Sequence, residues 1–134
     1  MSTIIRQIIS TDNAAKPIAP FNVCFSQAIV VNQTVYLSGC IGINKETSKL
    51  VDGGVVPETI KTLENMKGIL EAAGSGIDKV VKVTIFVDDM NDFAKVNEEY
   101  MKVFTTNFPA RSCVQMAKLP MNAKVEIEVI ALVG

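Results

Sequence analysis

Histidine is absent from the 134 residues of this chain. Its absence removes the commonest general base, the Ser-His and Cys-His nucleophile pairs and most zinc sites. The glycines also lack the spacing of a phosphate-binding loop. Any catalysis therefore has to use carboxylates, hydroxyl groups, backbone groups or bound water, and we expect neither a metal ion nor a cofactor.

Cysteine is scarce, and its three copies are Cys24, Cys40 and Cys113. An odd number without paired spacing fits reduced thiols better than a disulfide framework, and three scattered cysteines do not make a zinc site. Residues 1–10 are interrupted by Arg6 and Gln7, so they lack the apolar core of a signal peptide, and they hold too little arginine for a transit peptide. These features predict a cytoplasmic protein and leave mitochondrial or nuclear pools open.

Tryptophan, long apolar runs and a basic excess are missing as well. Aromatic residues make up only 6% of the chain, so its core has to be aliphatic. No apolar run reaches the roughly 18 residues of a membrane span, so no membrane partner is expected. The net charge is −1 and the pI is about 5.4, which argues against a dedicated nucleic-acid binder, because such proteins usually carry a basic excess.

The composition predicts one ordered domain over residues 1–134, since hydrophobic residues make up 49% and charged residues 20% of the chain. No linker, repeat or low-complexity segment divides it. Alternating or β-rich patterns predict strands at residues 3–9, 27–31, 34–38, 81–87, 111–118 and 124–132. Helical spacing of apolar residues predicts two amphipathic helices, one from Pro57 to Gly74 and one capped by Asp92.

This order of elements predicts an α+β fold. Each amphipathic helix needs a sheet face to cover, and both helices on one face of a mixed sheet give a two-layer sandwich. The second face would then mix apolar side chains with charge. Its members would be Arg111, Gln115 and Ala117 on one strand, and Glu126, Ile130 and Leu132 on the next. Such a face is typical of a subunit interface, so we expect an oligomer.

Arg111 is the most informative residue of the chain. It is one of only two arginines, and it stands just after Pro109 at the start of a predicted strand. A guanidinium group is a planar fork that matches a carboxylate with two parallel hydrogen bonds, which lysine cannot do. The next strand carries Glu126 and Glu128, and one fork with one carboxylate suffices to hold a small carboxylic acid beside an activated water. For an arbitrary arginine, a solvated strand-end charge would be the commoner interpretation.

Several stretches form one pattern that runs in order through nearly the whole chain. They are Ser26-Gln27-Ala28, Tyr36-Leu37-Ser38-Gly39, Glu71-Ala72-Ala73-Gly74, Asn91-Asp92-Phe93 with Val96-Asn97, Phe108-Pro109-Ala110-Arg111-Ser112, Leu119-Pro120 and Val125-Glu126-Ile127-Glu128. Together they resemble the RidA (YjgF) family of reactive-intermediate deaminases. The resemblance implies a chorismate mutase-like homotrimer with active sites in the clefts between subunits. It also implies hydrolysis of 2-imino acids, such as 2-iminobutanoate and 2-iminopropanoate, to 2-oxo acids and ammonia.

The resemblance assigns roles to individual residues. It implies that Arg111 grips the substrate carboxylate and that Glu126 orients or activates the attacking water. Main-chain groups of Cys113 would help to hold the water and the imine nitrogen, with the thiol lining the cleft, although a buried cysteine is more often a packing residue. Glu128 is interpreted as structural or interfacial.

Ser38, Gly39 and Asn97 complete the predicted surroundings of the substrate. Ser38 and Gly39 end a strand, where a hydroxyl group and a backbone N–H can face a pocket, and simple strand termination is an equally good interpretation. By resemblance Asn97 belongs to the site surroundings, and a capping or interface role is the alternative.

Two departures from the family pattern affect the entrance of the site. Phe25 stands where the family has a tyrosine, after an apparent insertion, and Phe21 is the alternative match. Phenylalanine keeps the ring and loses the hydroxyl group. The substrate-binding contact of Phe25 would therefore be apolar, without the hydrogen bond that a tyrosine hydroxyl could give. Cys40 stands where the family commonly has glutamine.

Two other functions are weighed against imine hydrolysis. One is a single-strand-RNA endoribonuclease or translation inhibitor, a role also attached to the family, which the lack of histidine and the acidic pI oppose. The other is a non-catalytic, chaperone-like binding trimer, which the altered loop at Phe25 keeps open. An assay of imine lifetime with and without protein separates these alternatives.

Overall fold

A six-stranded sheet is the main feature of the computed structural model, which describes residues 4–18 and 24–134. Its strands lie in the order β1-β2-β3-β8-β6-β7. They are β1 (Arg6–Ile9), β2 (Ala28–Val31), β3 (Thr34–Leu37), β6 (Val80–Val87), β7 (Ala110–Gln115) and β8 (Val125–Leu132). A small hairpin of β4 (Ile43–Asn44) and β5 (Lys49–Leu50) lies in a segment whose sequence has no regular pattern.

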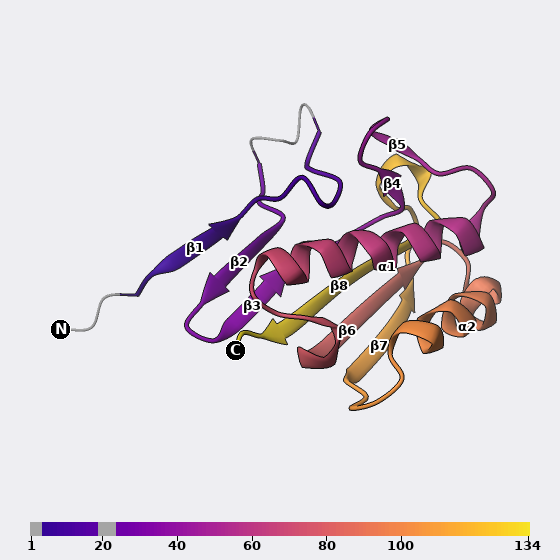
Figure 1. Ribbon diagram of the computed structural model, residues 1–134. Helices are drawn as coiled ribbons and strands as arrows, with labels where there is room; N and C mark the ends of the chain where they lie inside the picture. The colour runs from indigo at the N-terminus through magenta and orange to yellow at the C-terminus, as the bar shows by residue number, and fades with distance from the viewer. Residues whose placement is uncertain (1–3, 19–23) are drawn as a thin grey trace.

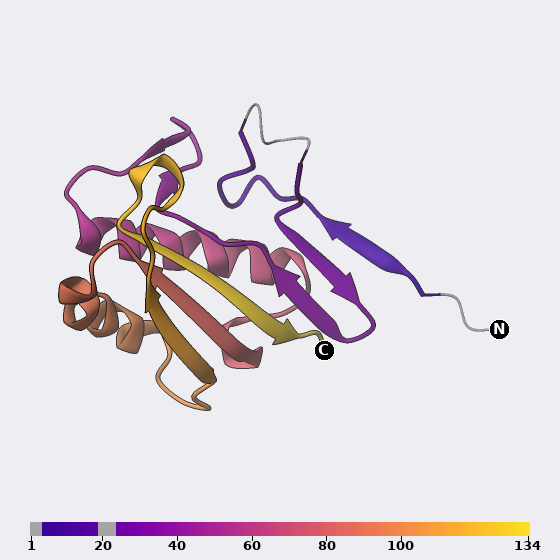
Figure 2. The same cartoon turned by 180° about the vertical axis from the view of Figure 1, so that it is seen from behind.

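Both helices, α1 (Val55–Ala72) and α2 (Phe93–Val103), cover the same face of this sheet (Figure 1). Seen from behind, the other face carries none of the helices that the described residues form (Figure 2). The sheet is mixed, because β6 and β7 are parallel and joined through α2, whereas the other neighbours are antiparallel. The predicted two-layer α+β sandwich is therefore confirmed. None of the described helices has the length and apolarity that crossing a bilayer requires.

Element ends differ from the predictions where local turns intervene. Helix α1 begins at Val55, so Pro57 lies inside its first turn. Strand β7 ends at Gln115, because its partner β6 ends at Val87. The last hydrogen bond between these strands runs from the Met116 N–H to the Val87 carbonyl, at 2.9 Å. Strand β1 begins at Arg6, and residue 3 of the predicted strand lies outside the described residues.

The predicted side-chain cap of α2 by Asp92 is wrong. Residues Met90–Asp92 form a 3-10 turn (η3) directly before the helix, and Asp92 itself has φ −86° and ψ −3°. Its side chain therefore makes no capping hydrogen bond. Asp89 does this work one turn earlier, where its side chain accepts the Asn91 N–H at 2.9 Å.

The core between the helices and the sheet is aliphatic, as the composition predicts. Its largest fully buried side chains include Met66 and Leu70 of α1, Ile85 of β6 and Ile127 of β8. Burying each such side chain stabilises the fold by about 1.5–3 kcal/mol. Alternation along β8 buries Val125, Ile127, Val129 and Ala131 under the helices. The residues between them, Glu126, Glu128, Ile130 and Leu132, therefore lie on the open face.

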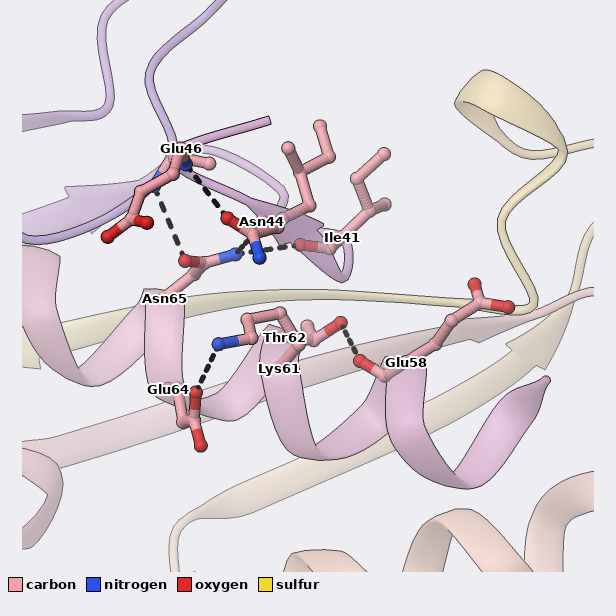
Figure 3. A network of polar contacts seen from close by, with 10 residues as sticks. Ile41, Asn44, Glu46, Glu58, Lys61, Thr62, Glu64 and Asn65 are labelled. Atoms are coloured by element: carbon pink, nitrogen blue, oxygen red, sulfur yellow. Dashed lines mark hydrogen bonds and ion pairs between the residues drawn. The ribbon is translucent and has the colours of Figure 1, made fainter. Parts of the chain in front are cut away.

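Asn65 ties helix α1 to two loops (Figure 3). Its side-chain amide donates to the carbonyl oxygens of Ile41 at 3.1 Å and Ile43 at 2.9 Å. Its Oδ1 accepts the Ala15 N–H at 3.3 Å. Asn65 is only 6% exposed. Its side chain therefore supplies hydrogen bonds that water would otherwise make to these main-chain groups.

Asn65→Ala should lower the free energy of unfolding by about 2–4 kcal/mol, because three hydrogen bonds are lost. The Ile41 carbonyl would keep its second bond from the Ile43 N–H, whereas the Ile43 carbonyl would lose the bond from Asn65. Glu64→Ala is the matched control on the same helix, since it removes only an exposed ion pair with Lys61, worth about 0–1 kcal/mol. Denaturant unfolding at one protein concentration measures both variants. Equal losses in the two variants would contradict the clamping role of Asn65.

Candidate functional site

A cavity of about 630 Å³ opens beside the end of β3. Four of the predicted site residues line it: Phe25, Ser38, Gly39 and Glu126. The rest of its wall is mostly apolar and comes from residues 15–18, the segment from the end of β3 into β4, the turn before β8, and α1. Its members include Ile18, Ile41, Ile43, Ile69 and Met121. Phe25 is 49% exposed there, and its ring offers no hydroxyl group. The alternative match Phe21 and the segment before it lie outside the described residues.

Glu126 lies against the main chain of Gly39. Beyond β3 the chain pairs again with β8 through Cys40, whose N–H donates to the Ile127 carbonyl at 2.8 Å and whose carbonyl accepts the Ile127 N–H at 2.9 Å. This pairing leaves so little space that a Cβ atom at position 39 would lie 2.7 Å from Oε2 of Glu126. Glycine is therefore required there for the carboxylate to occupy its place in the cavity wall.

Ser38, in the cavity wall, is bound to the neighbouring strand segment through its hydroxyl group. Its Oγ donates to the Ser26 carbonyl at 2.6 Å, and its N–H donates to the Gln27 carbonyl at 3.0 Å. The Ser38 hydroxyl proton is therefore engaged within the chain, and only the oxygen lone pairs face other groups. Gln27 in turn binds the loop at Thr11 and Ala15, with its Nε2 2.9 Å from the Ala15 carbonyl oxygen.

The cavity carboxylate is electrostatically unusual. Burial raises the pKa of Glu126, and the negative charge of Glu128 on the same face raises it further. A carboxyl group with a raised pKa exchanges protons with water closer to neutral pH. Burial also raises the pKa of the Cys40 thiol to about 12, so this thiol stays protonated at neutral pH.

Arg111, Asn97 and Cys113 form a second cluster, between β7 and α2. The Nη1 of Arg111 donates to Oδ1 of Asn97 at 2.7 Å. Its guanidinium carbon lies 4.6 Å from the ring centroid of Tyr100 and 5.6 Å from that of Phe93. Among the described residues, no carboxylate forms an ion pair with Arg111. Its remaining N–H groups are thus available to an anion.

Cys113 lies two residues after Arg111 and is half-buried. Burial raises the pKa of its thiol, and the charge of Arg111 opposes this only partly. The thiol is therefore protonated at neutral pH and a poor nucleophile. The role of its main chain in holding water and the imine nitrogen stays a prediction.

The two clusters lie on opposite faces of the sheet, which corrects the expectation that Arg111 and Glu126 share the second face. Arg111 pairs with Val83, which is fully buried under the helices, whereas Glu126 pairs with Phe86 on the open face. Strand β6 lies between β7 and β8, so Arg111 and Glu126 are two strand spacings apart, about 10 Å across the sheet. Their partners on β6, Val83 and Phe86, are three residues apart, which adds about 10 Å along the strands. Within one chain, the guanidinium and the carboxylate cannot hold the same small molecule.

A family profile described as Endoribonuclease L-PSP, which is the RidA/YjgF family, matches residues 11–133. The chain belongs to this family. The predicted resemblance is therefore confirmed over almost its full length.

Individual RidA-family relatives match the chain end to end. The RutC family protein UK114 of Drosophila melanogaster is 59% identical over all of this chain and 94% of the relative. The 2-iminobutanoate/2-iminopropanoate deaminase of Homo sapiens is 46% identical over all of this chain and 95% of the relative. The crystal structure of E. coli TdcF with bound serine superimposes with a TM-score of 0.87 at 37% identity, covering 96% of this chain and 99% of TdcF.

Glu128→Gln should lower the pKa of the Glu126 carboxyl group. The substitution removes the neighbouring negative charge and keeps the shape, while burial of Glu126 continues to hold its pKa above the ordinary value of 4.5. Carboxyl-carbon NMR titration of both proteins measures the difference. Glu71→Gln, a change on the exposed side of α1, should leave the Glu126 titration unchanged. An unshifted Glu126 titration in Glu128→Gln would show that the two carboxylates do not interact.

Proposed function

We propose that this protein hydrolyses 2-imino acids, such as 2-iminobutanoate and 2-iminopropanoate, to 2-oxo acids and ammonia. The observation that carries the proposal is Arg111, a half-buried guanidinium held by Asn97 without an acidic partner among the described residues. Such a group suits a planar carboxylate. The names of the human and mouse relatives, both 46% identical, support the choice of an imino acid.

The active site we infer is built from two subunits of a homotrimer. One subunit supplies the cavity with Glu126, Gly39 and Phe25, and its neighbour supplies Arg111 with Asn97 and Cys113. The positions of the two clusters on opposite faces of one chain support this division. The open face supports an assembly, because it exposes large apolar side chains such as Tyr36 (50% exposed) and Leu132 (45% exposed).

The reaction needs positioning and proton transfer. Arg111 would hold the substrate carboxylate, which places the imine carbon beside Glu126. Glu126 in its ionised form would accept a proton from water as the oxygen attacks the protonated imine carbon, giving a carbinolamine. The same carboxyl group would then return the proton to nitrogen, and ammonia leaves as the ionised carboxylate takes up the hydroxyl proton and the carbonyl forms. The raised pKa of Glu126 suits both transfers near neutral pH.

The description of the matched family as an endoribonuclease makes RNA cleavage the rival to exclude. The chain has no histidine, the side chain that most often serves as acid and base in such cleavage. RNA cleavage by a nuclease-free preparation, measured beside the imine assay, compares the two activities directly. Binding without either activity would favour the chaperone-like trimer.

Arg111→Lys should lose most of the imine hydrolysis while the fold persists. Lysine keeps the charge and cannot form the two-point contact with a carboxylate. Loss of one hydrogen bond to a charged group costs about 1.5–3 kcal/mol, or one to two decades in kcat/KM. The rate of imine disappearance, with the exposed Lys67→Arg as a surface control, measures the effect. Wild-type rates in Arg111→Lys would sink the proposed carboxylate fork.

Sedimentation equilibrium at micromolar concentration should give about three times the 14.5 kDa mass of the chain. The exposed apolar side chains of the open face need a covering surface, and a trimer supplies it. A stable monomer that still hydrolyses imines would disprove the two-subunit site.

Mixed trimers test the division of the site between subunits. Arg111→Lys and Glu126→Gln subunits, each with little activity alone, should recover about a quarter of wild-type activity when they assort randomly at equal amounts, because each interface combines two independently chosen subunits. Native mass spectrometry confirms that mixed trimers have formed. If mixed trimers form and no activity returns, both residues act within one subunit and the proposed arrangement is wrong.

A further inference from the structure

One face of α2 surrounds the guanidinium group of Arg111. Phe93, Asn97 and Tyr100 are spaced at i, i+4 and i+7, so they lie along one side of the helix. The two rings lie 5.6 Å and 4.6 Å from the guanidinium carbon, and Asn97 accepts one of its N–H groups at 2.7 Å. The sequence pattern alone assigns both aromatic residues to the core.

These contacts fix the guanidinium group without occupying its binding edges. A guanidinium has five N–H donors, and Asn97 takes one of them, whereas a ring face attracts the cation and consumes no N–H in its plane. A glutamate or aspartate in the same place would also fix Arg111. It would, however, compete with the substrate carboxylate for the same donors.

The rings are themselves held in place. Tyr100 is buried and stacks on Phe104, with ring centroids 4.4 Å apart and an angle of 20° between the planes. Phe93 is half-buried at the first position of α2. Rigid supports of this kind reduce the cost of ordering a binding group when the ligand arrives.

We propose that Phe93 and Tyr100 are positioning residues that hold Arg111 in the orientation that binds the substrate carboxylate. The role of that carboxylate rests on the proposed function. Without the rings, the Arg111 side chain spends a smaller fraction of its time in the binding orientation, and the apparent affinity falls by that fraction.

Phe93→Leu tests the proposal with Met101→Leu as the control, since Met101 lies on the exposed side of the same helix. Calorimetry measures binding of 2-oxobutanoate, the stable product acid, and steady-state kinetics measures imine hydrolysis. Phe93→Leu should raise the dissociation constant and KM by about three- to tenfold and change kcat by less than about twofold. Met101→Leu should match the wild type in all three quantities.

A double-mutant cycle separates positioning from packing. In an Arg111→Lys background, Phe93→Leu should cause no further loss of 2-oxobutanoate affinity, because the group that the ring positions is already gone. Tyr100→Phe keeps the ring and should bind like the wild type. An equal loss in both backgrounds, or a wild-type dissociation constant in Phe93→Leu, would overturn the proposal.

The binding and kinetic measurements can disprove the positioning role and the hydrolase proposal independently of each other. If the wild type binds 2-oxobutanoate through Arg111 and does not accelerate imine loss, the hydrolase proposal is wrong and the positioning role stands on the binding cycle. If the wild type does not bind 2-oxobutanoate at all, the positioning role is overturned with the carboxylate site.

Discussion

The pairing of β8 with both β3 and β6 is the constraint on which the candidate site depends. The strand lies inside the sheet, so its alternation has to bury Val125, Ile127 and Val129 under the helices. That requirement places Glu126 and Glu128 on the open face, and the added bridge between Cys40 and Ile127 brings Gly39 against the Glu126 carboxylate. A slip of one residue would exchange the two faces and bury both charges, so the hydrophobic pattern of β8 fixes the chemistry of the cavity.

Much of this could be read from the sequence, because the strands that carry it have a clear period. In β8 the residues Val125, Ile127, Val129 and Ala131 alternate with more polar neighbours, and in β6 the pattern is almost as regular. Both helices show apolar faces, which predicted two layers. The resemblance singled out Glu126, and the strand end singled out Ser38 and Gly39, but only the structure shows that the Glu126 carboxylate lies against Gly39.

The face that Arg111 occupies could not be read in this way. The six residues of β7, Ala110–Gln115, show no alternation of apolar and polar side chains, so the sequence does not say which side the helices cover. Only the parallel register with β6, in which Val83 pairs with Arg111, decides it. Asn65 and Gln27 were missed for a related reason: each is a buried polar residue whose partners are main-chain groups of distant loops. An amide at a position of the apolar helix face was the signal that could have identified Asn65.

Separation of Arg111 from Glu126 within the chain has an electrostatic consequence. If the two side chains formed an ion pair in one subunit, the guanidinium would lower the pKa of the carboxyl group and lose its free donors. In the observed arrangement burial and Glu128 raise the pKa of Glu126, while Arg111 is held by an amide and two rings. In the proposed trimer both groups face the same cleft from different subunits, so the neighbouring guanidinium would lower the pKa of Glu126 while the site is empty. A bound substrate carboxylate would neutralise that guanidinium and so restore the raised pKa that proton transfer requires.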